Sequence, residues 1–158
     1  MRVAFYTLGC KLNQAETESL VGQFEQSGFQ LVSPNDVADI YIVNTCTVTH
    51  IADRKSRHWF RLARRRKPQA LIIATGCYAQ RSHQELAQLA DLVVDNTVKL
   101  HLLAIIQALS LEERGPEPVL SLSKDEREPK QSQILATTIR TRSLIKIQDG
   151  CRGPCTYC

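Results

Sequence analysis

The sequence has no long hydrophobic run, and nowhere does it approach the roughly eighteen uninterrupted apolar residues of a membrane-spanning helix. Its first ten residues, MRVAFYTLGC, reach Gly-Cys too soon to hold the apolar core and cleavage site of a secretory signal. These two absences exclude membrane-spanning and exported classes of protein from our interpretation. We therefore expect a soluble cytoplasmic protein that does not associate with a membrane.

A glycine-rich phosphate loop is also missing. None of the seven glycines falls in the pattern GxxxxGK[ST], whose backbone N–H groups cradle the phosphates of a nucleotide. This absence counts against a flavodoxin-like nucleotide binder, which is one alternative for a chain of this kind.

Cysteine, by contrast, is plentiful, with six residues in a chain of 158. Three stand singly in the first half, as Cys10, Cys46 and Cys77, and three are bunched at the end in CRGPCTYC. Without an export signal the reducing cytosol favours metal binding or catalysis over structural disulfides. The 43% of apolar residues is enough to bury a hydrophobic core.

Positive charge is concentrated in one segment. The net charge is +4, yet residues 54–67 hold eight Lys or Arg and no Asp or Glu, and the rest of the chain carries 12 basic and 16 acidic side chains. Such a local basic stripe is typical of a surface that captures a polyanion. The alternative is an ordinary solvated helix face.

Short β-branched runs alternate with helical patterns along the first two thirds of the chain. We predict strands over residues 2–8, 39–45, 70–76 and 92–95 and helices over residues 14–28, 49–67, 83–90 and 99–113. In the first helix, Glu16 and Glu18 suit the first turn. This alternation predicts an α/β fold, an open parallel sheet with helices on both faces, of the Rossmann or flavodoxin-like kind.

The composition divides the chain into three parts. Residues 1–114 form the predicted α/β domain, and residues 115–133 are rich in Pro, Ser and charge, which is typical of a linker. Residues 134–158 begin with a strand-like run that leads directly into the terminal cysteines, and we interpret them as the start of a second domain.

Each single cysteine is expected to lie in a loop at the carboxyl end of a predicted strand, in TLGC, NTC and TGC. Because the carboxyl ends of parallel strands meet at one edge, Cys10, Cys46 and Cys77 can converge on one site. Any one of them alone could simply pack as a small hydrophobic residue. Together they predict metal or cluster binding, either a three-thiolate iron–sulfur cluster or a zinc site completed by His50.

The terminal cysteines Cys151, Cys155 and Cys158 have the spacing Cys-x3-Cys-x2-Cys. Three ligands leave one iron of a 4Fe-4S cluster without a protein ligand. This motif after SLIKIQDG resembles that of the radical S-adenosyl-L-methionine enzymes, in which the open iron binds S-adenosyl-L-methionine. The resemblance implies that Tyr157 lies on the adenine side of that cofactor.

The resemblance extends into the first half of the chain. GCKLNQAETESL, NTCTVTHIADRKSRHWFRLARRRKPQALIIATGCYAQ and IKIQDGCRGPCTYC are similar to the methylthiotransferases, most of all to the branch that acts on N6-threonylcarbamoyladenosine beside the tRNA anticodon (the MtaB type). It implies two 4Fe-4S clusters, an auxiliary one on Cys10, Cys46 and Cys77 and a radical-generating one on the terminal cysteines. It also implies a flavodoxin- or ferredoxin-type reductant.

Family members continue beyond this motif into a partial barrel and an RNA-binding module, so the resemblance implies a truncated chain that is inactive alone. It makes the basic helix a candidate for contact with tRNA phosphates, through Arg54, Arg57, Arg61 and Arg65. Two other functions stay open, namely a zinc-stabilised nucleic-acid-binding module and a methylthiotransferase of the isopentenyladenosine type.

Overall fold

A computed structural model describes residues 1–112 of the chain. The predicted linker, the predicted second domain and the four terminal site residues Cys151, Cys155, Tyr157 and Cys158 lie outside the described residues. Within the described part, no helix is both long and apolar enough to cross a membrane.

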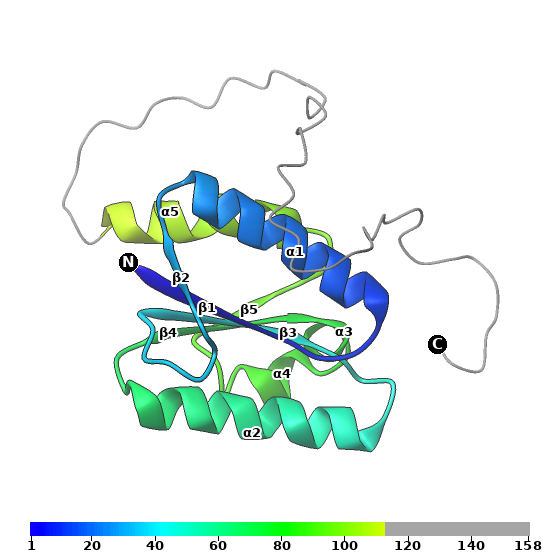
Figure 1. Ribbon diagram of the computed structural model, residues 1–158. Coiled ribbons are helices and arrows are strands. Elements are labelled where there is room, and N and C mark those ends of the chain that lie inside the picture. Colours follow the sequence, from blue (N-terminus) through cyan, green and yellow to red (C-terminus); the bar gives the residue numbers. More distant parts are fainter. Residues whose placement is uncertain (113–158) are drawn as a thin grey trace.

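The centre of the domain is a five-stranded, all-parallel sheet with the strand order β2-β1-β3-β4-β5 (Figure 1). The strands are β1 (Arg2–Thr7), β2 (Gln30–Val32), β3 (Ile40–Thr45), β4 (Leu71–Gly76) and β5 (Leu92–Val94). Every residue of β3 is buried, as expected for the central strand of a parallel sheet covered on both faces. The predicted open parallel α/β fold is confirmed.

Helices cover both faces of the sheet. In Figure 1, α1 and α5 lie on one face, and α2 and α4 lie on the other. The bounds are α1 (Lys11–Gln26), α2 (His50–Arg66), α3 (Cys77–Arg81), α4 (His83–Leu86), the 3₁₀ helix η1 (Lys99–His101) and α5 (Leu102–Glu112). Thr49 caps α2, because its hydroxyl accepts a hydrogen bond from the Ala52 N–H at 3.2 Å.

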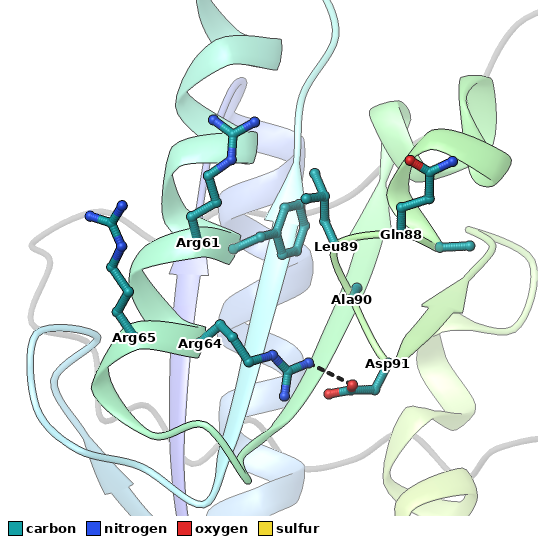
Figure 2. A pocket seen from close by; sticks show the side chains of 9 residues that line it. Arg61, Arg64, Arg65, Gln88, Leu89, Ala90 and Asp91 are labelled. Carbon is teal, nitrogen blue, oxygen red and sulfur yellow. Dashed lines mark hydrogen bonds and ion pairs between the residues drawn. The ribbon is translucent and has the colours of Figure 1, made fainter.

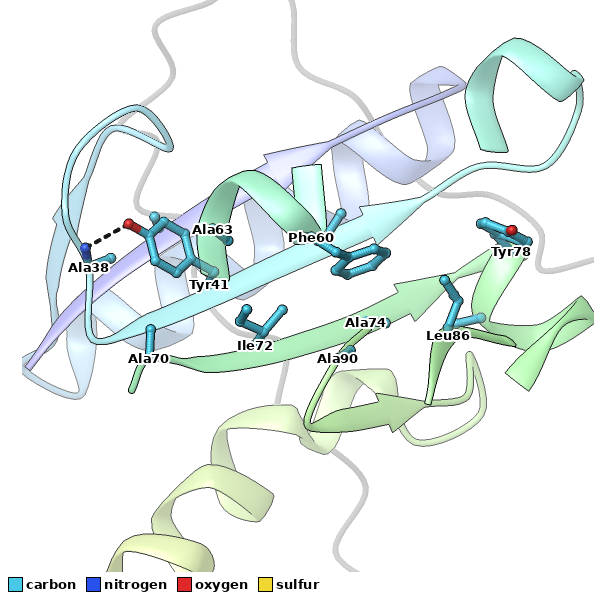
Figure 3. Close-up of a cluster of buried hydrophobic side chains, with 13 residues drawn as sticks. Ala38, Tyr41, Phe60, Ala63, Ala70, Ile72, Ala74, Tyr78, Leu86 and Ala90 are labelled. Atoms are coloured by element: carbon cyan, nitrogen blue, oxygen red, sulfur yellow. Dashed lines mark hydrogen bonds between the residues drawn. The ribbon is translucent and has the colours of Figure 1, made fainter. Parts of the chain in front are cut away.

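Alternation along the strands divides the apolar core into two layers. On β3, Ile40 and Ile42 face α1 and α5, whereas Tyr41 and Val43 face α2. The layer under α1 and α5 contains Leu20, Phe24, Leu102 and Ile106. The opposite layer, drawn in Figure 3, packs the ring of Phe60 from α2 among side chains of β3, β4, α3 and α4, including Ile72, Tyr78 and Leu86.

Several predicted elements differ from the structure in extent. Strand β2 was not predicted, the helix predicted over residues 83–90 is the four-residue α4, and α3 before it was not predicted. Helix α1 begins three residues earlier than predicted, which moves Glu16 out of the first turn and buries it.

Candidate metal centre at the carboxyl edge of the sheet

The three single cysteines follow three neighbouring strands. Strand β3 lies between β1 and β4, with Thr7 paired to Asn44 and Thr45 paired to Gly76. Cys46 and Cys77 therefore come directly after a registered pair, while Cys10 is the N-cap of α1, three residues beyond β1. Adjacent strands are about 4.8 Å apart, so this order gathers all three cysteines at one edge. The predicted convergence on the carboxyl edge agrees with this topology, although Cys77 begins α3 instead of lying in a loop.

Two glycines make close approach possible at this edge. Gly9 has φ +102°, and a Cβ there would lie 2.6 Å from Cys46 Cβ and 2.7 Å from Cys46 Sγ. Gly76 has φ +95°, and a Cβ there would lie 2.5 Å from Asn44 Oδ1. Both positions need a left-handed backbone and no side chain. The loop before Cys10 therefore packs directly on the side chain of Cys46.

A buried polar network fixes the loops behind the cysteines. Asn13 Nδ2 donates to the carbonyls of Leu8 (2.9 Å) and Thr45 (3.0 Å), which joins the turn after β1 to the end of β3. Asn44 Nδ2 in turn donates to the Asn13 carbonyl (2.9 Å) and to Thr17 Oγ1 (3.0 Å). Both amide nitrogens are satisfied in this way, whereas the buried Asn44 Oδ1 has no hydrogen-bond partner among the described residues. These bonds hold the strand ends in one arrangement.

A buried ion pair joins α1 to the start of η1. Lys99 Nζ lies 2.5 Å from Glu16 Oε2, and the two side chains are 2% and 8% exposed. Sequence reasoning missed this pair, since its partners are 83 residues apart. A signal was present, however, because Glu16 shares a helical face with the buried Leu20 and Phe24.

The three thiols differ in exposure. Cys10 is exposed, Cys77 is half-buried and Cys46 is buried, and all three are free cysteines. Burial raises the pKa of the Cys77 thiol, and the neighbouring thiols Cys46 and Cys10 raise that pKa further. The effect of Cys46 and Cys10 on Cys77 agrees with their placement at one edge.

A single metal ion and an iron–sulfur cluster require different arrangements of ligands. Within residues 1–112, no three His, Cys, Asp or Glu side chains converge as the ligands of one metal ion. His50, the reserve zinc ligand, is exposed at the start of α2. A cubane cluster spreads its thiolates over separate irons, and three cysteine sulfurs are the donors that iron–sulfur clusters take. The three thiols are thus donors that suit an iron–sulfur cluster, and thiolate is also a ligand of zinc.

Some basic side chains of α2 bond to other residues of the domain, and others are exposed. Arg57, one of the four candidate tRNA contacts, donates to Tyr78 Oη at 2.6 Å and to Glu85 Oε1 at 3.1 Å. Arg57 was expected to contact tRNA together with Arg54, Arg61 and Arg65, but its guanidinium is bonded within the domain. Arg54, Arg61 and Arg65 are exposed, as expected.

The fold and the edge define the class of protein: an open parallel α/β domain that presents three thiols where such sheets bind ligands. The family described as "Uncharacterized protein family UPF0004" matches residues 2–98, which is more than half of the chain. The chain belongs to this family.

Several relatives whose names state an activity are also similar to this chain. "Threonylcarbamoyladenosine tRNA methylthiotransferase MtaB" of Aquifex aeolicus (strain VF5) is 45% identical over 100% of this chain and 39% of the relative. The protein of that name from Bacillus subtilis (strain 168) is 40% identical over 99% and 35%. The "tRNA-2-methylthio-N(6)-dimethylallyladenosine synthase" of Methylacidiphilum infernorum (isolate V4) is 30% identical over 96% and 34%.

The resemblance to methylthiotransferases expected from the sequence is thus confirmed. The chain spans less than two fifths of the length of each of these three relatives.

Proposed function

We propose that the protein to which these residues belong is a radical S-adenosyl-L-methionine tRNA methylthiotransferase. It inserts a methylthio group at C2 of N6-threonylcarbamoyladenosine beside the anticodon, and residues 1–112 supply the auxiliary cluster site. The observation that carries this proposal is the placement of three free thiols after three adjacent parallel strands. The names of the relatives support the reaction class and tRNA as the substrate.

The identities of the named relatives support the proposed substrate branch. Relatives named for threonylcarbamoyladenosine reach 45% and 40% identity, whereas the relative named for dimethylallyladenosine reaches 30%. This difference favours the threonylcarbamoyl branch over the isopentenyladenosine branch.

In this proposal Cys10, Cys46 and Cys77 hold one 4Fe-4S cluster, and Cys151, Cys155 and Cys158 hold the second. The auxiliary cluster, when bound, supplies an iron with an open position for the sulfur that is transferred. The chain's own contribution is positional: Gly9 lets the loop of Cys10 reach Cys46, and Asn13 fixes that loop to the end of β3. Tyr157 is proposed to flank the adenine of S-adenosyl-L-methionine, and a flavodoxin- or ferredoxin-type protein is proposed as the reductant.

Anaerobic reconstitution of the 158-residue chain with iron and sulfide tests the proposal. We expect about eight irons per chain, since each cubane contains four. Replacing Cys10, Cys46 and Cys77 together by serine should leave about four irons, and so should the matched triple replacement of Cys151, Cys155 and Cys158. The absorption and electron paramagnetic resonance spectra of each variant should still show one 4Fe-4S cluster.

If the chain is instead a zinc-stabilised nucleic-acid-binding module, the same preparation should contain zinc and no iron. A chain that binds one zinc ion and no iron, and that loses this zinc with His50→Ala, would overturn the proposal. Unchanged iron content after the triple replacement at Cys10, Cys46 and Cys77 would do the same.

A further inference from the structure

Four of the eight Lys and Arg side chains in residues 54–67 attach helix α2 and its C-cap residue to the rest of the domain. Arg57 bonds Tyr78 and Glu85, Arg64 pairs with Asp91 at 2.5 Å, and Lys67 pairs with Asp39 at 2.5 Å. Arg66 donates to the Pro34 carbonyl and lies 5.5 Å from the centre of the Trp59 ring. These four cations are therefore satisfied within the domain.

Three other arginines of α2 have no hydrogen bond or ion pair with any described residue. Arg54, Arg61 and Arg65 are exposed, and together with the exposed His58 they follow one another at intervals of four, three and four residues. At 3.6 residues per turn this spacing places all four on one face, which we call the α2 stripe. With a rise of about 1.5 Å per residue, the stripe is about 16 Å long.

Without a bound partner, the like charges of the α2 stripe destabilise the helix. Arg61 and Arg65 are like charges at i and i+4, which destabilises a helix by a few tenths of a kcal/mol. The nearby carboxylate of Asp91 does not neutralise them, because it pairs with Arg64 and accepts the Ile72 N–H at 2.8 Å. A bound polyanion would offset this repulsion.

A pocket adjoins the stripe. It has a volume of about 420 Å³ and is lined by Phe60, Arg61, Arg64, Arg65 and residues 87–91. Figure 2 shows Arg61 and Arg65 extended outward from α2 on one side, while Arg64 turns toward Asp91. Gln88 lines the pocket from the segment that follows α4. Two free guanidinium groups beside a concave surface suit the oxygens of phosphate groups.

We propose that the α2 stripe binds the phosphate backbone of RNA. An acidic protein surface is the less favoured occupant, because protein interfaces have an apolar centre. Among the described residues, no exposed large hydrophobic side chain lies between Arg54 and Arg65, and the exposed Ile51 lies three residues before the stripe begins. The stripe begins near the cysteine edge, since α2 starts four residues after Cys46. The identification of this RNA as the tRNA substrate rests on the proposed function. The binding of an RNA backbone by the stripe does not depend on that function.

Salt-dependent binding of RNA to the 158-residue chain tests the proposal. The probes are an unmodified tRNA transcript and an RNA hairpin of unrelated sequence. For Arg61→Gln/Arg65→Gln we expect at least about tenfold weaker binding at 50 mM salt and a slope of log K against log salt that is smaller by about 1.4 to 1.8. Both RNAs should be affected equally, because phosphate contacts carry no sequence information.

The control variant, Arg2→Gln/Lys55→Gln, removes the same charge from exposed residues outside the stripe. It should keep most of the affinity and the slope, and circular dichroism should show both variants folded. Equal effects of the two double variants, or no salt-dependent RNA binding by the parent chain, would overturn the proposal. The iron content of the stripe variant should match that of the parent, so a failure here is distinguishable from a failure of the proposed function.

Discussion

At the scale of single residues, Gly9 is the most constrained position beside the three cysteines. Its φ of +102° lies in the left-handed region, and the space of a Cβ is already taken by Cys46. A side chain at this position must therefore either strain the backbone or displace a candidate ligand.

We expect Gly9→Ala to lower the free energy of unfolding by about 1 to 3 kcal/mol, the typical cost of such a backbone conformation in a residue with a Cβ. It should also reduce iron binding after reconstitution. The matched control is Gly22→Ala inside α1, where a Cβ meets nothing within 4 Å. That change should raise stability by up to about 1 kcal/mol. Urea denaturation of both variants measures these effects, and a neutral Gly9→Ala would contradict the packing described here.

At the scale of elements, the carboxyl end of α2 is fastened to the start of β3. Asp39 accepts a hydrogen bond from Lys67 Nζ and another from the Arg2 backbone N–H at 2.7 Å. These two bonds, the one from Lys67 foremost, lower the pKa of Asp39 below its ordinary value. The pair is about one third exposed, so its contribution is at most about 1 kcal/mol.

The lowered pKa of Asp39 fixes the sign of a pH effect. Stability from this carboxylate is fully present above the ordinary aspartate pKa of about 3.9 and is lost as the pH falls through the lower folded value. We expect Asp39→Asn to be less stable than the parent at pH 7, with the difference shrinking toward pH 3. Thermal unfolding between these values measures it. Asp36→Asn, at an exposed residue nearby, is the matched control.

The elements also show what the sequence could and could not predict. Strands β1, β3 and β4 were predicted because each is a compact apolar run, and their alternation with helices was enough to predict the edge where the single cysteines gather. Strand β2 was missed because it has only three residues. The start of α1 was misplaced because its N-cap is Cys10, which makes no side-chain cap.

Partners far apart in the sequence were beyond prediction for a different reason. Helical spacing places Arg57 near the other arginines, and only the packing of α2 against α3 and α4 turns its guanidinium to Tyr78. The identity of the ligand at the three thiols stays a prediction, since iron and zinc both bind cysteine.

At the scale of the whole molecule, the Lys99–Glu16 pair connects the first helix of the domain to the segment that leads into the last. Both side chains are more than nine-tenths buried. Removing one partner from a buried ion pair leaves a charge without compensation, which typically costs about 3 to 5 kcal/mol.

We expect Lys99→Met to lower the free energy of unfolding by about that amount. The double variant Glu16→Gln/Lys99→Met should recover part of the loss, because no net charge is then left buried. A urea denaturation series of the single and double variants gives the comparison. Equal stability of the single and double variants would show that the loss arises from packing and not from an uncompensated charge.

The spacing of the three strand-end cysteines has one last consequence. Cys10, Cys46 and Cys77 are 36 and 31 residues apart in the sequence, yet folding brings them to one side of the sheet. Any prosthetic group bound by all three cysteines would close two long loops. An unfolded chain can close such loops only at a substantial entropic penalty. Assembly of that group and folding would then be a single linked equilibrium, in which the supply of the group would set how long the domain survives proteolysis.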